Sequence, residues 1–186
     1  IGKAALTVAP ANQSKIYGAP NPALTFSYAG FAGSDNAGSL TTAPVAVTTA
    51  TTTSGVGTYP ITVSGGVSPN YTFTYVGGTL TIDPKALTVT ANDQTKTYDG
   101  NAYSGGNGVT ITGFAGTDDV TSLGGALVYN GTSQGAKNAG TYTIDPSGYT
   151  SANYDISYTT GTLTIDPKAL TVTANNQTKT YDGNAY

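Results

Sequence analysis

The chain has 186 residues and a formal net charge of −3, and only 9% of its residues are charged. It contains no Cys and no His, which excludes disulfide bonds, thiolate metal sites and histidine-based catalysis. Seven basic residues against ten acidic ones leave no basic footprint for a nucleic acid, and no apolar run approaches the ~20 residues of a membrane helix.

One sequence returns along the chain at a spacing of 83 residues. Residues 78–103 and 161–186 are identical except that Asn176 stands where the earlier copy has Asp93. The register continues outside this segment, because GFAGSD at 30–35 returns as GFAGTD at 113–118. We therefore predict one repeat at 1–83, a second at 84–166, and the first strand of a third, incomplete repeat at 167–186. A tandem array favours spacing or multivalent display over a single reaction centre.

Apolar and polar residues alternate along most of each repeat, from the opening Leu6-Thr7-Val8 onward. One apolar face and one threonine-rich face predict antiparallel sheets packed face to face. With six or seven strands in each repeat, the pattern indicates an all-β fold of tandem Ig-like antiparallel β-sandwich domains. Residues 35–39 and 118–122 each predict one helical turn, capped by Ser34 or Thr117. Asp35, Asp118 and Asp119 would suit the positive N-terminal end of its dipole. Two tight hairpin turns are expected, at Gly77-Gly78 and Thr160-Gly161.

The first repeat meets the second at Asp83-Pro84-Lys85, and Asp166-Pro167-Lys168 recurs at the next boundary. Proline fixes its own φ and pushes the preceding Asp into an extended conformation. We expect the last strand of one repeat to run almost directly into the first strand of the next. Such a short joint favours an elongated rod.

Two groups of residues suggest turn formation or metal binding. Tyr98-Asp99-Gly100, which returns as Tyr181-Asp182-Gly183, predicts a turn, since Asp caps it and Gly accepts a positive φ. Asp99 together with Asp118 and Asp119 is a candidate set for Ca²⁺, which prefers several oxygen ligands. The spacing matches no EF-hand loop, however, and no other cofactor is expected.

The residues around Ser133 and two tyrosines shared by both repeats are further candidates for a functional role. Gly131 to Gly135 reads G-T-S-Q-G, the pattern of a hydrolase nucleophile turn, but the chain has no His to act as a base. We therefore expect no catalytic residues and no enzyme activity. Tyr59 and Tyr142, in a shared G-T-Y sequence, are expected to be core or corner tyrosines with a polar tip.

The first repeat, with ANQSKIYGAPNPAL, GFAGSD and NYTFTYVGGTLTID, resembles the MBG family of mostly bacterial Ig-like repeats. The second, with KALTVTANDQTKTYDGNAY and GFAGTDDV, resembles the related YDG family, from which the first repeat departs at Tyr17-Gly18. The resemblance covers essentially the whole chain. It implies stalks of secreted or surface-anchored bacterial adhesins, including filamentous-haemagglutinin-like proteins, with no catalytic residues.

The expected function is thus a non-enzymatic structural stalk, extracellular or on the bacterial surface, whose partners are the neighbouring repeats of the same chain. Two alternatives stay open. The repeats are an adhesive module for a glycan or protein ligand, or the chain forms filaments. In the second case the strand at Ala169–Ala174, with apolar Leu170 and Val172, adds to the sheet of a neighbouring molecule.

Overall fold

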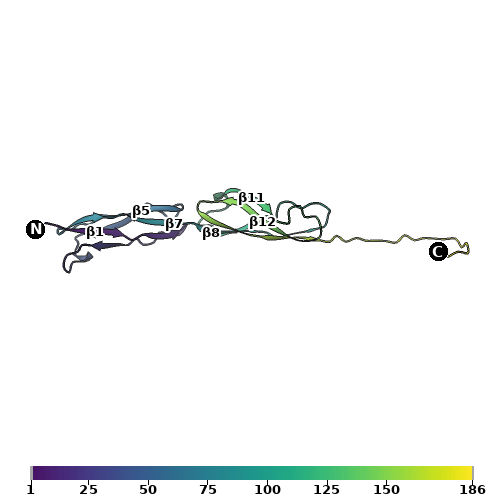
Figure 1. Ribbon diagram of the computed structural model, residues 1–186, viewed down its shortest axis with the longest axis horizontal. Helices are drawn as coiled ribbons and strands as arrows, with labels where there is room; N and C mark the ends of the chain where they lie inside the picture. The colour runs from purple at the N-terminus through teal and green to yellow at the C-terminus, as the bar shows by residue number, and fades with distance from the viewer. Residues whose placement is uncertain (1, 186) are drawn as a thin grey trace.

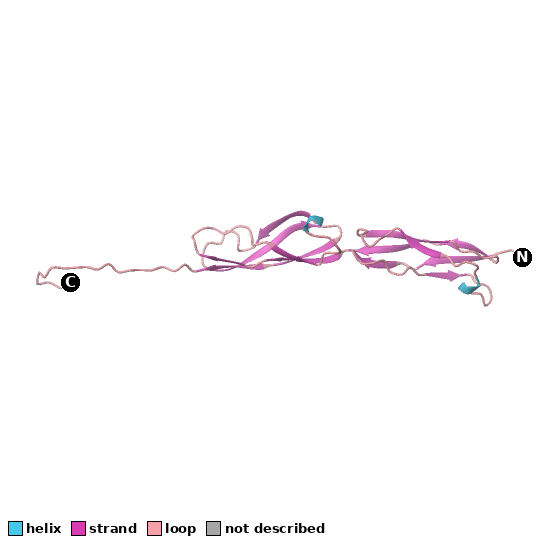
Figure 2. Cartoon of the chain, turned by 180° about the vertical axis from the view of Figure 1, so that it is seen from behind, coloured by secondary structure: helices cyan, strands magenta, loops and turns pink. Residues whose placement is uncertain are grey.

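The computed structural model describes residues 2–185, which form two β-units in line followed by a long extended segment (Figure 1). Each unit has seven strands and one short 3₁₀ turn, so the all-β prediction is confirmed (Figure 2). The first unit contains β1 (Ala4–Pro10), β2 (Gln13–Ile16), β3 (Phe26–Ala29), η1 (Ala37–Ser39), β4 (Val45–Thr48), β5 (Gly57–Ser64), β6 (Tyr71–Tyr75) and β7 (Gly78–Asp83). The second contains β8 (Lys85–Ala91), β9 (Gln94–Thr97), β10 (Val109–Thr112), η2 (Val120–Ser122), β11 (Gly124–Asn130), β12 (Gly140–Thr150), β13 (Tyr154–Thr159) and β14 (Gly161–Asp166).

Each unit is a sandwich of a three-stranded and a four-stranded sheet. The strand orders are β3-β1-β6 and β2-β7-β5-β4 in the first unit, and β10-β8-β13 and β11-β12-β14-β9 in the second. The predicted sandwich is therefore confirmed, but its sheets are not purely antiparallel. β1 pairs with β6 and β2 with β7 in parallel, and the second unit repeats this arrangement.

These parallel pairs have a continuous register across both sheets. Ala4 faces Tyr71 and Gln13 faces Leu80, a constant separation of 67 residues. β6 and β7 thus lie in different sheets, and the predicted hairpin turn at Gly77-Gly78 is wrong. The chain crosses between the sheets there, beside the point where β1 gives way to β2. Thr160-Gly161 makes the same crossing between β13 and β14, so the second predicted hairpin is wrong as well.

Glycine is needed at each crossing because two segments of the chain approach each other closely. A Cβ at Gly78 would lie 2.8 Å from Cγ of Pro10, and one at Gly161 would lie 2.5 Å from the carbonyl oxygen of Ala91. A side-chain oxygen closes the crossing in both units. Asn12 accepts a hydrogen bond from the amide of Thr79 at 2.9 Å, and Asp93 accepts one from Thr162 at 2.7 Å.

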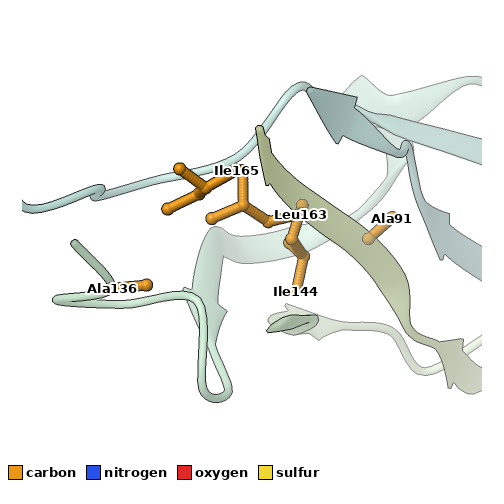
Figure 3. Close-up of a cluster of buried hydrophobic side chains, with 5 residues drawn as sticks. All are labelled: Ala91, Ala136, Ile144, Leu163 and Ile165. Atoms are coloured by element: carbon orange, nitrogen blue, oxygen red, sulfur yellow. The ribbon is translucent and has the colours of Figure 1, made fainter. Parts of the chain in front are cut away.

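The alternating apolar positions form the core of each sandwich. The fully buried aliphatic side chains come from the strands of both sheets, so the apolar faces pack against one another as predicted. In the first unit they are Leu6, Val8, Ile61, Leu80 and Ile82, and in the second Leu87, Val89, Ile144, Leu163 and Ile165. Figure 3 shows the part of the second core where Ile144, Leu163 and Ile165 meet Ala91 and Ala136.

Both helical turns are capped two residues beyond the predicted caps. Asn36 caps η1 by accepting from the amide of Gly38 at 2.9 Å, and Asp119 caps η2 by accepting from Thr121 at 2.8 Å. Ser34 and Thr117 therefore do not cap these turns. Asp35 and Asp118, expected at the positive end of the helical turn, bind tyrosine hydroxyls instead.

Residues 167–185 contain no strand, so the predicted first strand of a third repeat is not formed. The corresponding strands β1 and β8 each pair with two neighbours, and none of the described residues pairs with 169–174. Leu170 and Val172 are consequently 88% and 87% exposed. None of the helices within residues 2–185 has the length and hydrophobicity to cross a membrane.

Candidate functional site

The two units meet at Asp118, whose carboxylate binds a tyrosine from each of them. The hydroxyl of Tyr154, the first residue of β13, donates to Oδ2 of Asp118 at 2.5 Å. The hydroxyl of Tyr17, from the first unit, donates to the same oxygen at 3.0 Å. The oxygen of Tyr154 also accepts a hydrogen bond from the buried amide of Ala115 at 2.9 Å. One carboxylate thus connects the body of the second unit to the end of the first.

Tyr17 is held at the end of the first unit by its own backbone. It directly follows β2, and its amide donates to the carbonyl of Asp83, the last residue of β7, at 2.9 Å. Its ring meets that of Tyr154 edge-on, with centroids 5.4 Å apart and planes at 82°. The ring also packs against the buried cluster of Leu87, Ala115 and Tyr154. Tyr17 also packs against the buried cluster of the first unit, so its ring contacts the cores of both units.

A second contact joins a loop of the first unit to Asn153. The amide of Val56, just before β5, donates to Oδ1 of Asn153 at 3.0 Å. A Cβ at the neighbouring Gly55 would lie 3.1 Å from the same oxygen, which is tight. The loop before β5 thus approaches the second unit through its backbone.

Gly18 lies close against Ala115 of the second unit. A Cβ at this position would lie 2.4 Å from Cβ of Ala115, and its φ of +79° is one that glycine adopts readily. A small cavity of about 80 Å³ remains beside this contact, bordered by Tyr17, Thr52 and Asp118. Tyrosine followed by glycine therefore supplies both the hydrogen bond and the space for it.

Lys15 fixes the two loops of the first unit that contact the second. Its Nζ donates to the carbonyl of Ala19 at 2.9 Å and to that of Thr51 at 2.6 Å. These carbonyls belong to the loop after Tyr17 and the loop before Gly55. Burial of the ammonium group lowers the pKa of Lys15. A buried lysine thus sets the spacing between the tyrosine and the loop amide.

The linker is bound on both of its sides. Only Pro84 separates β7, which ends at Asp83, from β8, which begins at Lys85. The amide of Lys85 donates to the carbonyl of Asn153 and its Nζ to that of Phe114, both at 3.0 Å. Proline restricts the remaining residue. At the next boundary, the carbonyl of Asp166 accepts from Tyr98 at 2.8 Å, and Pro167-Lys168 leads into the extended segment.

Both tyrosines of the joint have a raised pKa, so they stay protonated and able to donate to higher pH than an ordinary tyrosine. Burial and then the hydrogen bond to Asp118 raise the pKa of Tyr154 to about 12. The pKa of Tyr17 is raised by the same two causes in the same order. Both phenols therefore stay neutral and able to donate to Asp118 well above neutral pH.

The family model for the MBG domain (YGX type) matches the chain twice, at residues 6–81 and 87–164. The chain belongs to the MBG family. Both units match one model, although the second carries the Tyr98-Asp99-Gly100 sequence that resembles the YDG type. In the first MBG unit the adjacent Tyr17 and Gly18 are the residues that contact Asp118 and Ala115 of the second unit.

A solved structure of a cell surface adhesin from Lactobacillus reuteri is similar to this MBG chain. The sequence identity is 25%, and the match covers 46% of this chain and 99% of that chain with a TM-score of 0.30. The comparison with curated proteins found no match.

Asp99 and Gly100 form a local turn in the second MBG unit. Asp99 accepts from Nζ of Lys96 at 2.8 Å and from the amide of Asn101 at 3.0 Å, and Gly100 has a φ of +78°. The hydrogen bond from Lys96, followed by that from Asn101, lowers the pKa of Asp99 to about 2. The same contacts recur in the extended segment, where Asp182 binds Lys179 and Asn184 and Gly183 has a φ of +79°.

The predicted calcium set is not assembled. Asp99 binds Lys96, Asp118 binds the two tyrosines of the joint, and Asp119 caps η2 through Thr121. Each carboxylate therefore has its own partner, and within residues 2–185 no three acidic side chains gather as metal ligands would. Asp118 and Asp119, although adjacent in sequence, serve different elements, so these three candidate residues are not brought together.

Ser133 and the shared tyrosines have structural contacts. The fully buried Ser133 donates to the carbonyl of Asn130 at 3.5 Å and accepts from Nε2 of Gln134 at 2.9 Å, within the loop between β11 and β12. The hydroxyls of Tyr59 and Tyr142 each donate to a carbonyl four residues earlier, that of Gly55 or Asn138, at 3.0 Å. Both are corner tyrosines, as predicted.

Sequence reasoning missed the residues that make the joint. Tyr17, Asn153 and the amide of Val56 carried no predicted contact between the units, and Asp118 was assigned to a helix end. A signal was present in the repeat itself. Asp118 and Asn153 have equivalents at Asp35 and Asn70, and Tyr17 has one at Tyr98. Polar residues that return at fixed spacing outside the apolar pattern indicate a contact made in every repeat.

Proposed function

We propose that this chain is a non-enzymatic structural segment of a bacterial cell-surface or secreted adhesin, in which MBG units form a stiff elongated stalk. The binding of Tyr17 and Tyr154 to Asp118 is the observation that carries this proposal. A flexible tether between domains has no need of such a contact, whereas a stalk depends on a fixed angle between neighbours.

Further support comes from the linker and the composition. A linker of one proline leaves little freedom between β7 and β8. Two hydrogen bonds besides the linker, from the Tyr17 hydroxyl and the Val56 amide, join the first unit to the second, so bending that separates either pair breaks a hydrogen bond. The chain also lacks His and Cys, the side chains most used for catalysis near neutral pH.

Paired spin labels test the stiffness directly. The chain has no Cys, so cysteines placed at the exposed Thr62 and Thr159 give one labelled pair, one label in each unit. We expect a narrow distance distribution by pulsed electron paramagnetic resonance, which broadens when four Gly-Ser residues are inserted between Asp83 and Pro84. The same insertion after Lys168 is the control and should leave the distribution narrow.

A broad distribution in the unmodified chain would contradict the stalk. A glycan array probed with residues 1–186 tests the ligand-binding alternative. The stalk proposal expects no binding there, and a reproducible hit that depends on one loop would favour an adhesive module.

One observation favours a second function, self-association through Ala169–Ala174. This segment corresponds to β1 and β8, yet Leu170 and Val172 are almost fully exposed and unpaired with any described residue. Pairing with the sheet edge of another molecule would cover them. Deletion of Lys168–Tyr186 should then abolish concentration-dependent assembly in sedimentation velocity. Assembly that is unchanged by the deletion excludes this role.

A further inference from the structure

The first MBG unit carries, at its N-terminal end, the acceptor group that the second unit uses at the joint. The hydroxyl of Tyr71 donates to Oδ2 of Asp35 at 2.7 Å and accepts from the amide of Ala32 at 2.9 Å. Asp118, Tyr154 and Ala115 make the same arrangement in the second unit. Tyr71 is buried as Tyr154 is.

The two ends differ in what fills them. The carboxylate of Asp118 accepts a hydrogen bond from the hydroxyl of Tyr17 in addition to that from Tyr154. The carboxylate of Asp35 accepts a hydrogen bond only from the hydroxyl of Tyr71 among residues 2–185. Asn153 accepts the amide of Val56, while the side chain of the equivalent Asn70 has no hydrogen-bond partner among the described residues. An opening of about 340 Å³ lies there, lined by Lys3, Ala32, Asp35, Asn70 and Tyr71.

The chain enters both units along the same path. Ala4 pairs with Tyr71 in β6, as Lys85 pairs with Tyr154 in β13. The amide of Ala4 donates to the carbonyl of Asn70 at 2.9 Å, as that of Lys85 does to Asn153 at 3.0 Å. Gly2-Lys3 therefore occupies the place of Asp83-Pro84, and a unit joined there arrives over the opening.

We propose that the opening lined by Asp35, Asn70 and Tyr71 is the docking site for the C-terminal end of another MBG unit of the tyrosine-glycine type. Asp35 binds the hydroxyl of a tyrosine equivalent to Tyr17, and Asn70 binds a loop amide equivalent to that of Val56. The residue after the tyrosine is a glycine, because a Cβ at Gly18 would overlap Ala115, whose equivalent is Ala32. The proposal rests on the proposed stalk function and names the partner that docks at the N-terminal end of the first unit.

A chain with the first unit duplicated tests the proposal. Residues 2–83 followed by one proline are placed before Ala4 of the complete chain, so that the added Asp83 and proline take the place of Gly2-Lys3. The readout is hydrogen exchange of the Val56 amide in the added copy, followed by nuclear magnetic resonance. We expect exchange about tenfold slower than in the same chain carrying Asn70→Ala, the factor that one ordinary hydrogen bond gives.

Two controls make the result specific. Both substitutions are made in the original first unit, onto which the added copy docks. There, Asp35→Ala should restore fast exchange of the added Val56 amide, as Asn70→Ala does. Neither substitution should change exchange of the Val56 amide that binds Asn153. If the added Val56 exchanges equally fast with and without Asn70 and Asp35, the docking site is overturned. Should the Val56 amide at Asn153 stay protected in that case, the stalk joint itself stands.

Discussion

The hydroxyl of Tyr17 lies 3.0 Å from the carboxylate of Asp118, although 101 residues separate them in the sequence. This hydrogen bond crosses from one MBG unit to the next and shares its acceptor oxygen with Tyr154, which belongs to the second unit. Asp118 is thus fixed by its own unit before the neighbour docks. The site is prepared in advance, so docking does not have to order the carboxylate.

Tyr17→Phe should loosen the joint without unfolding either unit. Loss of a hydrogen bond to a charged acceptor lowers the free energy of unfolding by about 1.5 to 3 kcal/mol, and we expect the lower end because Tyr17 is only partly buried. The distance distribution between labels at Thr62 and Thr159 should broaden. Tyr71→Phe is the control, since it removes a phenol that binds Asp35 inside the first unit and should leave this distribution narrow.

Gly18→Ala should weaken the joint more than its backbone strain alone explains. The new Cβ would lie 2.4 Å from Ala115, and forcing an extra methyl into a packed contact costs about 1 to 3 kcal/mol. Gly65→Ala is the control, because Gly65 has a φ of +84° and open space around its Cβ position. The difference between the two variants in denaturant unfolding isolates the contact. Equal losses would show that Ala115 yields freely.

Alkaline titration should separate Tyr154 from the exposed tyrosines. Its pKa is raised to about 12 in the folded chain, above the ordinary value near 10. The neutral phenol is therefore favoured by folding, so its stabilising effect is complete below pH 10 and is lost as the pH rises from 10 through 12. Ultraviolet absorbance of tyrosinate measures the titration. Tyr154→Phe should remove the latest-titrating tyrosine, and Asp118→Asn should lower the pKa of Tyr154 only in part, because burial remains.

Acid titration should report on the turn at Asp99. Lys96 and Asn101 lower the pKa of this carboxyl to about 2, so the turn is favoured above the ordinary pKa and loses this support as the pH falls from near 4 through 2. Lys96→Ala should raise the pKa of Asp99, measured by nuclear magnetic resonance of the side-chain carboxyl. The pKa of Asp182 should be lowered as well, since Lys179 repeats the contact in a segment outside both sandwiches. An ordinary pKa for Asp182 would mean that the turn needs the surrounding sheet.

The strands and cores could be predicted because they follow from a local rule. Leu87, Val89, Leu163 and Ile165 alternate with threonines, and a pleated strand turns that alternation into one buried face. The crossing at Gly78 could not be predicted in this way. A glycine between two alternating runs is equally compatible with a hairpin and with a change of sheet. The outcome depends on the parallel pairing with β1 and β2, which is distant in sequence.

The joint was beyond the pattern for a related reason. Tyr17, Gly18 and Asn153 lie at strand ends and in loops, where neither periodicity nor propensity constrains a residue. Their roles arise only when the linker at Pro84 places one unit against the other. Asp118 was assigned to the helical turn because it precedes η2, but the cap is Asp119, one residue later. Of these two adjacent carboxylates, that of Asp119 caps the helical turn and that of Asp118 lies at the interface between the units.

The register shared by β1 with β6 and β2 with β7 has a consequence for an MBG unit under tension. The polypeptide enters the first unit at β1 and leaves it at β7, and β1 runs parallel to β6 while its continuation β2 runs parallel to β7. Pulling the two ends apart therefore slides the strands along one another, so many backbone bonds resist together instead of opening in turn. Tension along the length of the chain would therefore load both MBG units in shear.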